Sequence, residues 1–200
     1  MLREAYLAVR VVGDGMQNNP EGKPVCMTTP QSKRHFIEQS IRTLTADLAV
    51  YLVDHSLMFA CAESCTGGWL AKSCTDLAGS SQWFDRSFVT YSNEAKQQML
   101  GVDAALIKEH GAVSEAVAAA MLSGLIENSL ATIGVSITGI AGPGGGTEQK
   151  PVGTVCFGFA VPGESPLTET CCFQGDRELV RLSSVEYVLK RLLVLVSAGA

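Results

Sequence analysis

The sequence predicts an α/β fold, arranged as a three-layer α/β/α sandwich around a mixed sheet. Apolar runs of strand length alternate along the chain with segments whose apolar residues recur at helical spacing, an order typical of layered α/β folds. Hydrophobic residues make up 46% of the 200 residues, which is enough to bury a core between such layers. The net charge of −5 argues against nucleic acid as a partner, because a nucleic-acid surface needs clustered lysine and arginine.

The expected elements follow one another as strands and helices. The first helix begins near residue 32 and spans roughly twenty residues, because its apolar residues recur every third or fourth position. A short apolar run predicts a buried strand at 57–62, and a helical period follows at 66–77. Further strands are expected at 87–91, 131–138, 152–161 and 167–173, and further helices at 93–100, 104–110, 114–130 and 177–196.

The first 32 residues differ in composition from the remainder. Glycines and prolines surround a polar middle there, which predicts a flexible N-terminal extension, residues 1–32, ahead of one domain at 33–200. The chain has no apolar run of transmembrane length, and its first residues lack the apolar stretch of a signal peptide. We therefore expect a cytoplasmic protein that contacts no membrane.

The seven cysteines give no pattern of a metal site. Their spacing matches no paired CxxC motif, and the three histidines lie far from them in the sequence. In a chain without an export signal, such cysteines are expected to be reduced thiols. The sequence therefore predicts neither a structural zinc site nor any other metal site.

The first candidate for chemistry is the segment AESCTGG at 62–68, where a predicted strand passes into a helix. A serine in the first turn of a helix lies beside free backbone N–H groups and the positive end of the helix dipole. These features would stabilise an oxyanion formed by attack of the Ser64 hydroxyl. Gly67 and Gly68 would let a substrate approach the backbone closely. The alternative is that Ser64 or Thr66 simply caps the helix.

A serine becomes a good nucleophile only when a neighbouring group takes its proton. The three histidines flank other helices, whereas Lys96 lies directly after the next predicted strand, in the first turn of a helix. Burial can lower the pKa of a lysine towards neutrality, so Lys96 can serve as a base. We predict that the Ser64 hydroxyl and the Lys96 amine lie within direct or one-water hydrogen-bond reach. The alternative is an ordinary surface lysine.

A glycine-rich loop and an arginine are candidates for binding an anion. The segment ITGIAGPGGGT at 137–147 leaves a predicted strand, and backbone N–H groups of such loops can cradle a phosphate. It matches neither the Walker motif nor GxGxxG, so a flexible crossover loop is the alternative. Arg177, before the last helix, suits phosphate because its donors form a rigid fork. The alternative for Arg177 is an ordinary exposed side chain.

Together these segments resemble the CinA C-terminal domain family, the nicotinamide-nucleotide amidase family. The resemblance covers residues 34–195, and several long motifs occur in the same order. It rests on AESCTGG (62–68), AGSSQWFDRSFVTYSNEAKQQMLGV (78–102), HGAVSE (110–115), TGIAGPGGGTEQKPVGTV (138–155) and GDRELVR (175–181).

The resemblance implies hydrolysis of the carboxamide of nicotinamide mononucleotide, which gives nicotinate mononucleotide and ammonia in pyridine nucleotide recycling. Ser64 would be the nucleophile and Lys96 its general base, with Tyr91 assisting the pair. Thr66, Gly67, Thr138, Gly139, Gly142 and Arg177 would line the site and hold the substrate. The implied partners are a small-molecule nucleotide and further copies of the chain in a homo-oligomer, and no metal or organic cofactor is expected. The alternative is a catalytically silent nucleotide-binding or regulatory member of the same family.

Overall fold

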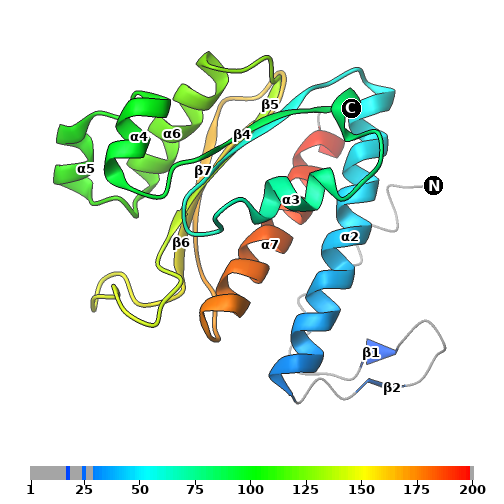
Figure 1. The fold of residues 1–200 in the computed structure, drawn as a ribbon, viewed down its shortest axis with the longest axis horizontal. Coiled ribbons are helices and arrows are strands. Elements are labelled where there is room, and N and C mark those ends of the chain that lie inside the picture. Colours follow the sequence, from blue (N-terminus) through cyan, green and yellow to red (C-terminus); the bar gives the residue numbers. More distant parts are fainter. Residues whose placement is uncertain (1–16, 19–23, 26–28, 199–200) are drawn as a thin grey trace.

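The computed structural model describes residues 17–18, 24–25 and 29–198, which form a sheet between two layers of helices (Figure 1). The strands are β1 (Gln17–Asn18), β2 (Pro24–Val25), β3 (Phe59–Glu63), β4 (Phe84–Val89), β5 (Ile133–Gly139), β6 (Thr154–Ala160) and β7 (Leu167–Cys172). The helices are α2 (Pro30–Asp54), α3 (Trp69–Thr75), α4 (Asn93–Leu100), α5 (Ala104–His110), α6 (Glu115–Glu127) and α7 (Arg177–Ala198), with a 3-10 turn, η1, at Ser80–Gln82. Strands β1 and β2 pair antiparallel, and most of the predicted extension, residues 1–32, lies outside the described residues.

The main sheet is mixed. Its strand order is β4-β3-β5-β6-β7, in which β4, β3 and β5 run parallel while β6 and β7 follow as antiparallel neighbours. Helices α2, α3 and α7 cover one face, and α4, α5 and α6 cover the other (Figure 1). The predicted three-layer α/β/α sandwich around a mixed sheet is confirmed.

Two apolar cores lie on the two faces of the sheet, as the alternation along β3 illustrates. Phe59 and Cys61 pack in the core beneath α2 and α7, whereas Ala60 and Ala62 pack in the core beneath α6. The α6 side is lined by small residues, and a Cβ atom on Gly134 would lie 2.5 Å from a methyl group of Leu125. Small side chains on this face therefore let α6 pack close to the sheet.

None of the helices in the described ranges is long and apolar enough to cross a membrane.

The predicted elements are all present, and the bounds of α4 and α5 match the prediction residue for residue. Two bounds are wrong in ways that bear on the site. Strand β4 begins at Phe84 rather than at 87, and it ends before Tyr91. Helix α3 begins at Trp69 rather than at 66, because Gly67 and Gly68 have φ values of +61° and +88°, which a right-handed helix cannot contain.

Candidate active site

Two neighbouring parallel strands bring the candidate residues to one edge of the sheet. Glu63, the last residue of β3, is the register partner of Val89, the last residue of β4. The pairing continues one residue further, because the amide of Thr90 donates to the carbonyl of Glu63 at 2.8 Å. The segments that follow the two strands, which begin at Ser64 and at Thr90, therefore start side by side.

Ser64 lies in a loop between β3 and α3 and not in the first turn of the helix, as the sequence had led us to expect. Its amide donates to the carbonyl of Ile137 at 2.9 Å, which ties the loop to the end of β5. The residue is buried, with 8% of its surface exposed. The free amides expected at the start of the helix are not found, since the amides of Gly68, Leu70 and Ala71 donate to the Glu63 carboxylate.

Lys96 reaches Ser64 from the first turn of α4. Ser92 is the N-cap of this helix, and its hydroxyl accepts from the amide of Ala95 at 3.0 Å. The Lys96 side chain is 2% exposed, and its Nζ lies 3.0 Å from the Oγ of Ser64 and 2.9 Å from the carbonyl oxygen of Thr90. The predicted proximity of the hydroxyl and the amine is confirmed.

The surroundings of Lys96 favour its neutral form. Burial lowers the pKa of its ammonium group below the ordinary lysine value, because desolvation disfavours the charge, and only a negatively charged Cys65 would oppose this shift. No ion pair joins Lys96 to a carboxylate in the described part of the chain. Burial also raises the pKa of the Cys65 thiol to about 12, so this neighbour stays neutral near pH 7.

Arg177, an exposed residue, joins three segments. It begins α7, and its guanidinium donates to the Tyr91 hydroxyl at 2.6 Å and to the carbonyl oxygen of Gly142 at 2.7 Å. Tyr91 is 60% exposed and follows β4 two residues beyond its end. The structure therefore brings Arg177, Tyr91 and the glycine loop together.

The other predicted residues of the glycine loop form its base. The Thr138 hydroxyl donates to the carbonyl of Ala112 at 2.7 Å, so its proton is used within the fold. A Cβ atom on Gly139 would lie 2.7 Å from Val155 and 3.0 Å from the Sγ of Cys65, so glycine allows β5 to pass close to the serine loop. Gly142 has a φ of +87°, which favours glycine over other residues at this turn.

Thr66 and Gly67 lie in the serine loop, beside an arginine that the sequence analysis missed. Thr66 is fully buried, and its Oγ1 has no hydrogen-bond partner among the described residues. Its carbonyl oxygen accepts from Arg181 at 2.7 Å, and the Arg181 guanidinium lies over the ring of Trp69, 4.9 Å from the ring centroid. The signal in the sequence was the four-residue spacing between Arg177 and Arg181, which places both on one face of α7.

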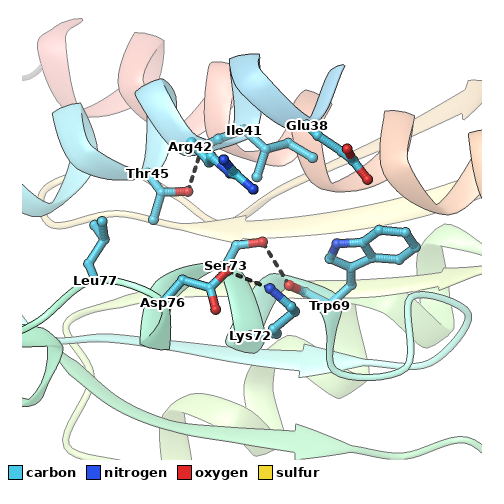
Figure 2. A pocket seen from close by; sticks show the side chains of 9 residues that line it. All are labelled: Glu38, Ile41, Arg42, Thr45, Trp69, Lys72, Ser73, Asp76 and Leu77. Atoms are coloured by element: carbon cyan, nitrogen blue, oxygen red, sulfur yellow. Dashed lines mark hydrogen bonds and ion pairs between the residues drawn. The ribbon is translucent and has the colours of Figure 1, made fainter. Parts of the chain in front are cut away.

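Two cavities of the structure lie away from Ser64 and Lys96. One, of about 300 Å³, separates α2 from α3 and is lined by charged and apolar side chains (Figure 2). Its lining residues are Glu38, Ile41, Arg42, Thr45, Trp69, Lys72, Ser73, Asp76 and Leu77. In the described ranges, no three histidine, cysteine, aspartate or glutamate residues converge in a way that could hold a metal ion.

The fold and this arrangement define a class of α/β protein in which a buried lysine meets a serine at the ends of two parallel strands. The chain belongs to the CinA C-terminal domain family, whose model matches residues 41–196. This match includes every residue that the sequence analysis placed in the site.

Relatives at high identity support the same assignment. The chain is 56% identical over 131 residues to a protein of Escherichia coli K12 named nicotinamide-nucleotide amidohydrolase PncC, over 66% of this chain and 79% of that protein. It is 47% identical over 156 residues to the protein of that name from Enterobacter agglomerans, over 78% and 95% of the two chains. Among solved structures, competence/damage inducible protein CihA from Agrobacterium tumefaciens superposes with a TM-score of 0.76 at 39% identity, over 78% of this chain and 95% of that one.

Proposed function

We propose that this protein hydrolyses the carboxamide of nicotinamide mononucleotide to nicotinate mononucleotide and ammonia, with Ser64 as the nucleophile and Lys96 as its base. The observation that carries the proposal is the 3.0 Å contact between Lys96 Nζ and Ser64 Oγ in a buried setting. The names of the relatives from Escherichia coli and Enterobacter agglomerans support the substrate. The reaction belongs to the recycling of pyridine nucleotides.

Lys96 is suited to take the proton of Ser64. A lysine can act as a base only when its amine is neutral, and burial shifts Lys96 towards that form. One N–H of the amine donates to the carbonyl of Thr90, which fixes the amine beside the hydroxyl. In the proposed first step, Ser64 Oγ bonds to the carboxamide carbon while its proton moves to Lys96 Nζ.

The developing oxyanion needs hydrogen-bond donors, and two amides beside Ser64 are available. The amides of Ser64, Gly67, Gly68, Trp69, Leu70, Ala71 and Lys72 all donate to acceptors within the fold. Those of Cys65 and Thr66 donate to no other residue in the described part of the chain. We assign these two amides as the oxyanion donors, and one such donor contributes about 3 kcal/mol to stabilisation of a transition state.

The remaining steps use the same groups. The protonated Lys96 gives its proton to the leaving nitrogen, the carbon–nitrogen bond breaks, and ammonia departs from an acyl ester on Ser64. A water molecule, deprotonated by neutral Lys96, then attacks the ester and releases the carboxylate. The Ser64 hydroxyl and the Lys96 amine are restored, so the sum of the steps is the addition of one water and the loss of one ammonia.

Arg177 is the proposed anchor for the phosphate of the nucleotide. Its contacts with Tyr91 and Gly142 hold the guanidinium beside the glycine loop. A rigid fork of donors fits phosphate oxygens, and the exposed amides of the glycine loop can add further donors. Tyr91, which the sequence analysis placed beside the serine and lysine, is proposed to orient Arg177.

The test is ammonium release from nicotinamide mononucleotide by the wild type, Ser64→Ala and Lys96→Ala. Lys108→Ala, an exposed lysine on α5, is the matched control. We expect release by the wild type and the control and a loss of release in the two site variants. Release that persists in either site variant would refute the mechanism, and saturable nucleotide binding without release by the wild type would favour a non-catalytic binding or regulatory module.

The predicted homo-oligomer is also a proposal. Its test is the mass of the full chain in solution, measured by light scattering after size exclusion. A monomer at the concentration used for the ammonium assay would refute it.

A further inference from the structure

Glu63 is a fully buried carboxylate directly before the candidate nucleophile. It is 0% exposed at the end of β3, and in the described ranges no lysine, arginine or histidine forms an ion pair with it. A buried charge without a counter-ion is costly unless several hydrogen bonds stabilise it. Neither the sequence analysis nor the proposed chemical steps give this residue a role.

The hydrogen bonds of this carboxylate all come from the start of α3 and from one thiol. Oε2 accepts from the amides of Gly68 at 3.0 Å and Leu70 at 3.1 Å, while Oε1 accepts from the amide of Ala71 at 2.8 Å. The Cys61 thiol lies 3.5 Å from Oε1. Glu63 therefore caps α3 from a position five residues ahead of the N-cap residue, Gly68.

This distant cap closes the serine loop into a ring. The chain leaves Glu63, passes Ser64, reverses through left-handed Gly67 and Gly68, and returns to the same carboxylate. Within this ring the amides of Cys65 and Thr66 are the two without an acceptor in another described residue. The carboxylate thus accepts from the amides at the start of the helix, while the Cys65 and Thr66 amides beside the serine donate to no other described residue.

Part of the opposite side of α3 borders a cavity. Trp69, Lys72 and Ser73 of this helix line a cavity of about 300 Å³ that separates it from α2 (Figure 2). The start of α3 is held on the sheet side by Glu63 and on the α7 side by Arg181, which donates to the Thr66 carbonyl and lies over Trp69. Of these two anchors, Glu63 is the one that binds the amides of the first turn directly.

We propose that Glu63 is a positioning residue, whose carboxylate fixes the loop at 64–68 so that the Cys65 and Thr66 amides point at the oxyanion of the reaction. This inference rests on the proposed function. It predicts that a change at Glu63 slows the chemical step and not the binding of substrate. A purely structural cap would affect stability alone.

The first variant is Glu63→Gln, which keeps the shape of the side chain but places an NH₂ group against one of the three amides. We expect kcat for ammonium release to fall by about 100-fold, because misplacement of catalytic groups by about 1 Å can cost this much, while KM stays near the wild-type value. Glu63→Asp keeps the charge on a shorter side chain and should give an intermediate loss. If Glu63→Gln fails to fold, Glu63→Asp decides the question.

The matched control is Asp103→Ala. Asp103 caps α5 through the amide of Ala105 at 2.8 Å, away from the site. This variant should lower the melting temperature without changing kcat or KM. An unchanged kcat in Glu63→Gln with a lowered melting temperature would show that Glu63 is only a cap, and it would overturn the proposal.

A second readout separates this proposal from the proposed substrate. A fluorophosphonate reacts with an activated serine, forms an Oγ–P bond, releases fluoride and places its phosphoryl oxygen where an oxyanion would lie. We expect intact mass spectrometry to show labelling of Ser64 in the wild type and labelling about 100-fold slower in Glu63→Gln. If the wild type is labelled but releases no ammonium, the proposed substrate is rejected. The ratio of the labelling rates of the wild type and Glu63→Gln then still decides the positioning role. Equal labelling rates, or no labelling of the wild type at Ser64, would overturn the positioning role.

Discussion

The two strand–helix junctions of the candidate site both need hydrogen-bond acceptors for the amides of a helix first turn, and they supply them in different ways. After β4, Ser92 caps α4 with its own hydroxyl, which accepts from the amide of Ala95. After β3, the N-cap position of α3 is Gly68, which has no side chain, and the amides of the first turn donate to Glu63. The cap at the β4–α4 junction is local, whereas the cap at the β3–α3 junction is a residue of the preceding strand.

This difference shows which parts of the structure position Lys96 and Ser64. Lys96 lies one turn into a regularly capped helix, so its place follows from helix geometry and from the register of β4 beside β3. Ser64 lies in an irregular loop that is held by contacts across the fold: the Ser64 amide donates to Ile137, and the Thr66 carbonyl accepts from Arg181. The position of Ser64, the candidate nucleophile, therefore depends on tertiary structure more than that of Lys96 does.

The largest expected effect comes from removing a reactive group from either junction. Ser64→Ala and Lys96→Ala should each lower kcat by about 10⁴-fold or more, and the double variant should be no slower than the single ones, because the two groups act as a unit. Steady-state ammonium release measures all three. Additive losses in the double variant would show that the two junctions act independently.

The second effect concerns the protonation of Lys96. Its pKa lies below about 10.4, the ordinary lysine value, and only the neutral amine can accept the serine proton. As the pH falls below that lowered pKa, kcat/KM should decrease about tenfold per unit, and above it the rate should level off. Lys96→Arg, whose guanidinium stays protonated, should be inactive across the range. A midpoint at or above the ordinary lysine value, or an active arginine variant, would contradict the assignment.

A smaller effect on catalysis is expected from Arg177, which links the β4–α4 junction to the glycine loop. Arg177→Ala should raise KM for nicotinamide mononucleotide by about tenfold or more, since hydrogen bonds to a charged group contribute about 1.5–3 kcal/mol. Arg42→Ala, an exposed arginine on the cavity between α2 and α3, is the control and should leave KM unchanged. Equal KM values for the wild type and Arg177→Ala would remove Arg177 from the substrate site.

The smallest effect is expected from the local cap. Ser92→Ala should lower the free energy of unfolding by about 1 kcal/mol, and Ser92→Asp should restore it, because both serine and aspartate accept from the first-turn amides. Chemical denaturation measures both variants. Because packing also holds α4, we expect kcat of Ser92→Ala to change little. A loss of kcat as large as that of Lys96→Ala would show that the position of Lys96 depends on the Ser92 cap as strongly as we propose that the serine loop depends on Glu63.

The features that could be predicted from the sequence are those set by local rules. The end of α4 followed from its terminal glycine, Gly101, and the meeting of Ser64 with Lys96 followed from two strands that end at one edge. The start of α3 was wrong because the residues after Ser64 fit a helical period until Gly67 and Gly68 adopt left-handed conformations.

The part that could not be predicted depends on contacts far apart in the sequence. Arg181 contacts Thr66 across 115 positions, and the two are neighbours only because α7 packs beside α3. The Thr138 hydroxyl was expected in the site, but its bond to Ala112 is formed only when α6 lies against the sheet. The four-residue spacing places Arg181 on the same face of α7 as Arg177, but no local pattern predicts which residues Arg181 and Thr138 contact.

The burial of the Cys65 thiol has a practical consequence for experiments on this protein. Because its pKa is raised to about 12, maleimides and iodoacetamide at neutral pH should leave it unmodified although it adjoins Ser64. Among the cysteines in the described ranges, Cys172 is the exposed one, at the end of β7. A fluorophore attached there would give a labelled protein in which Ser64 is unmodified.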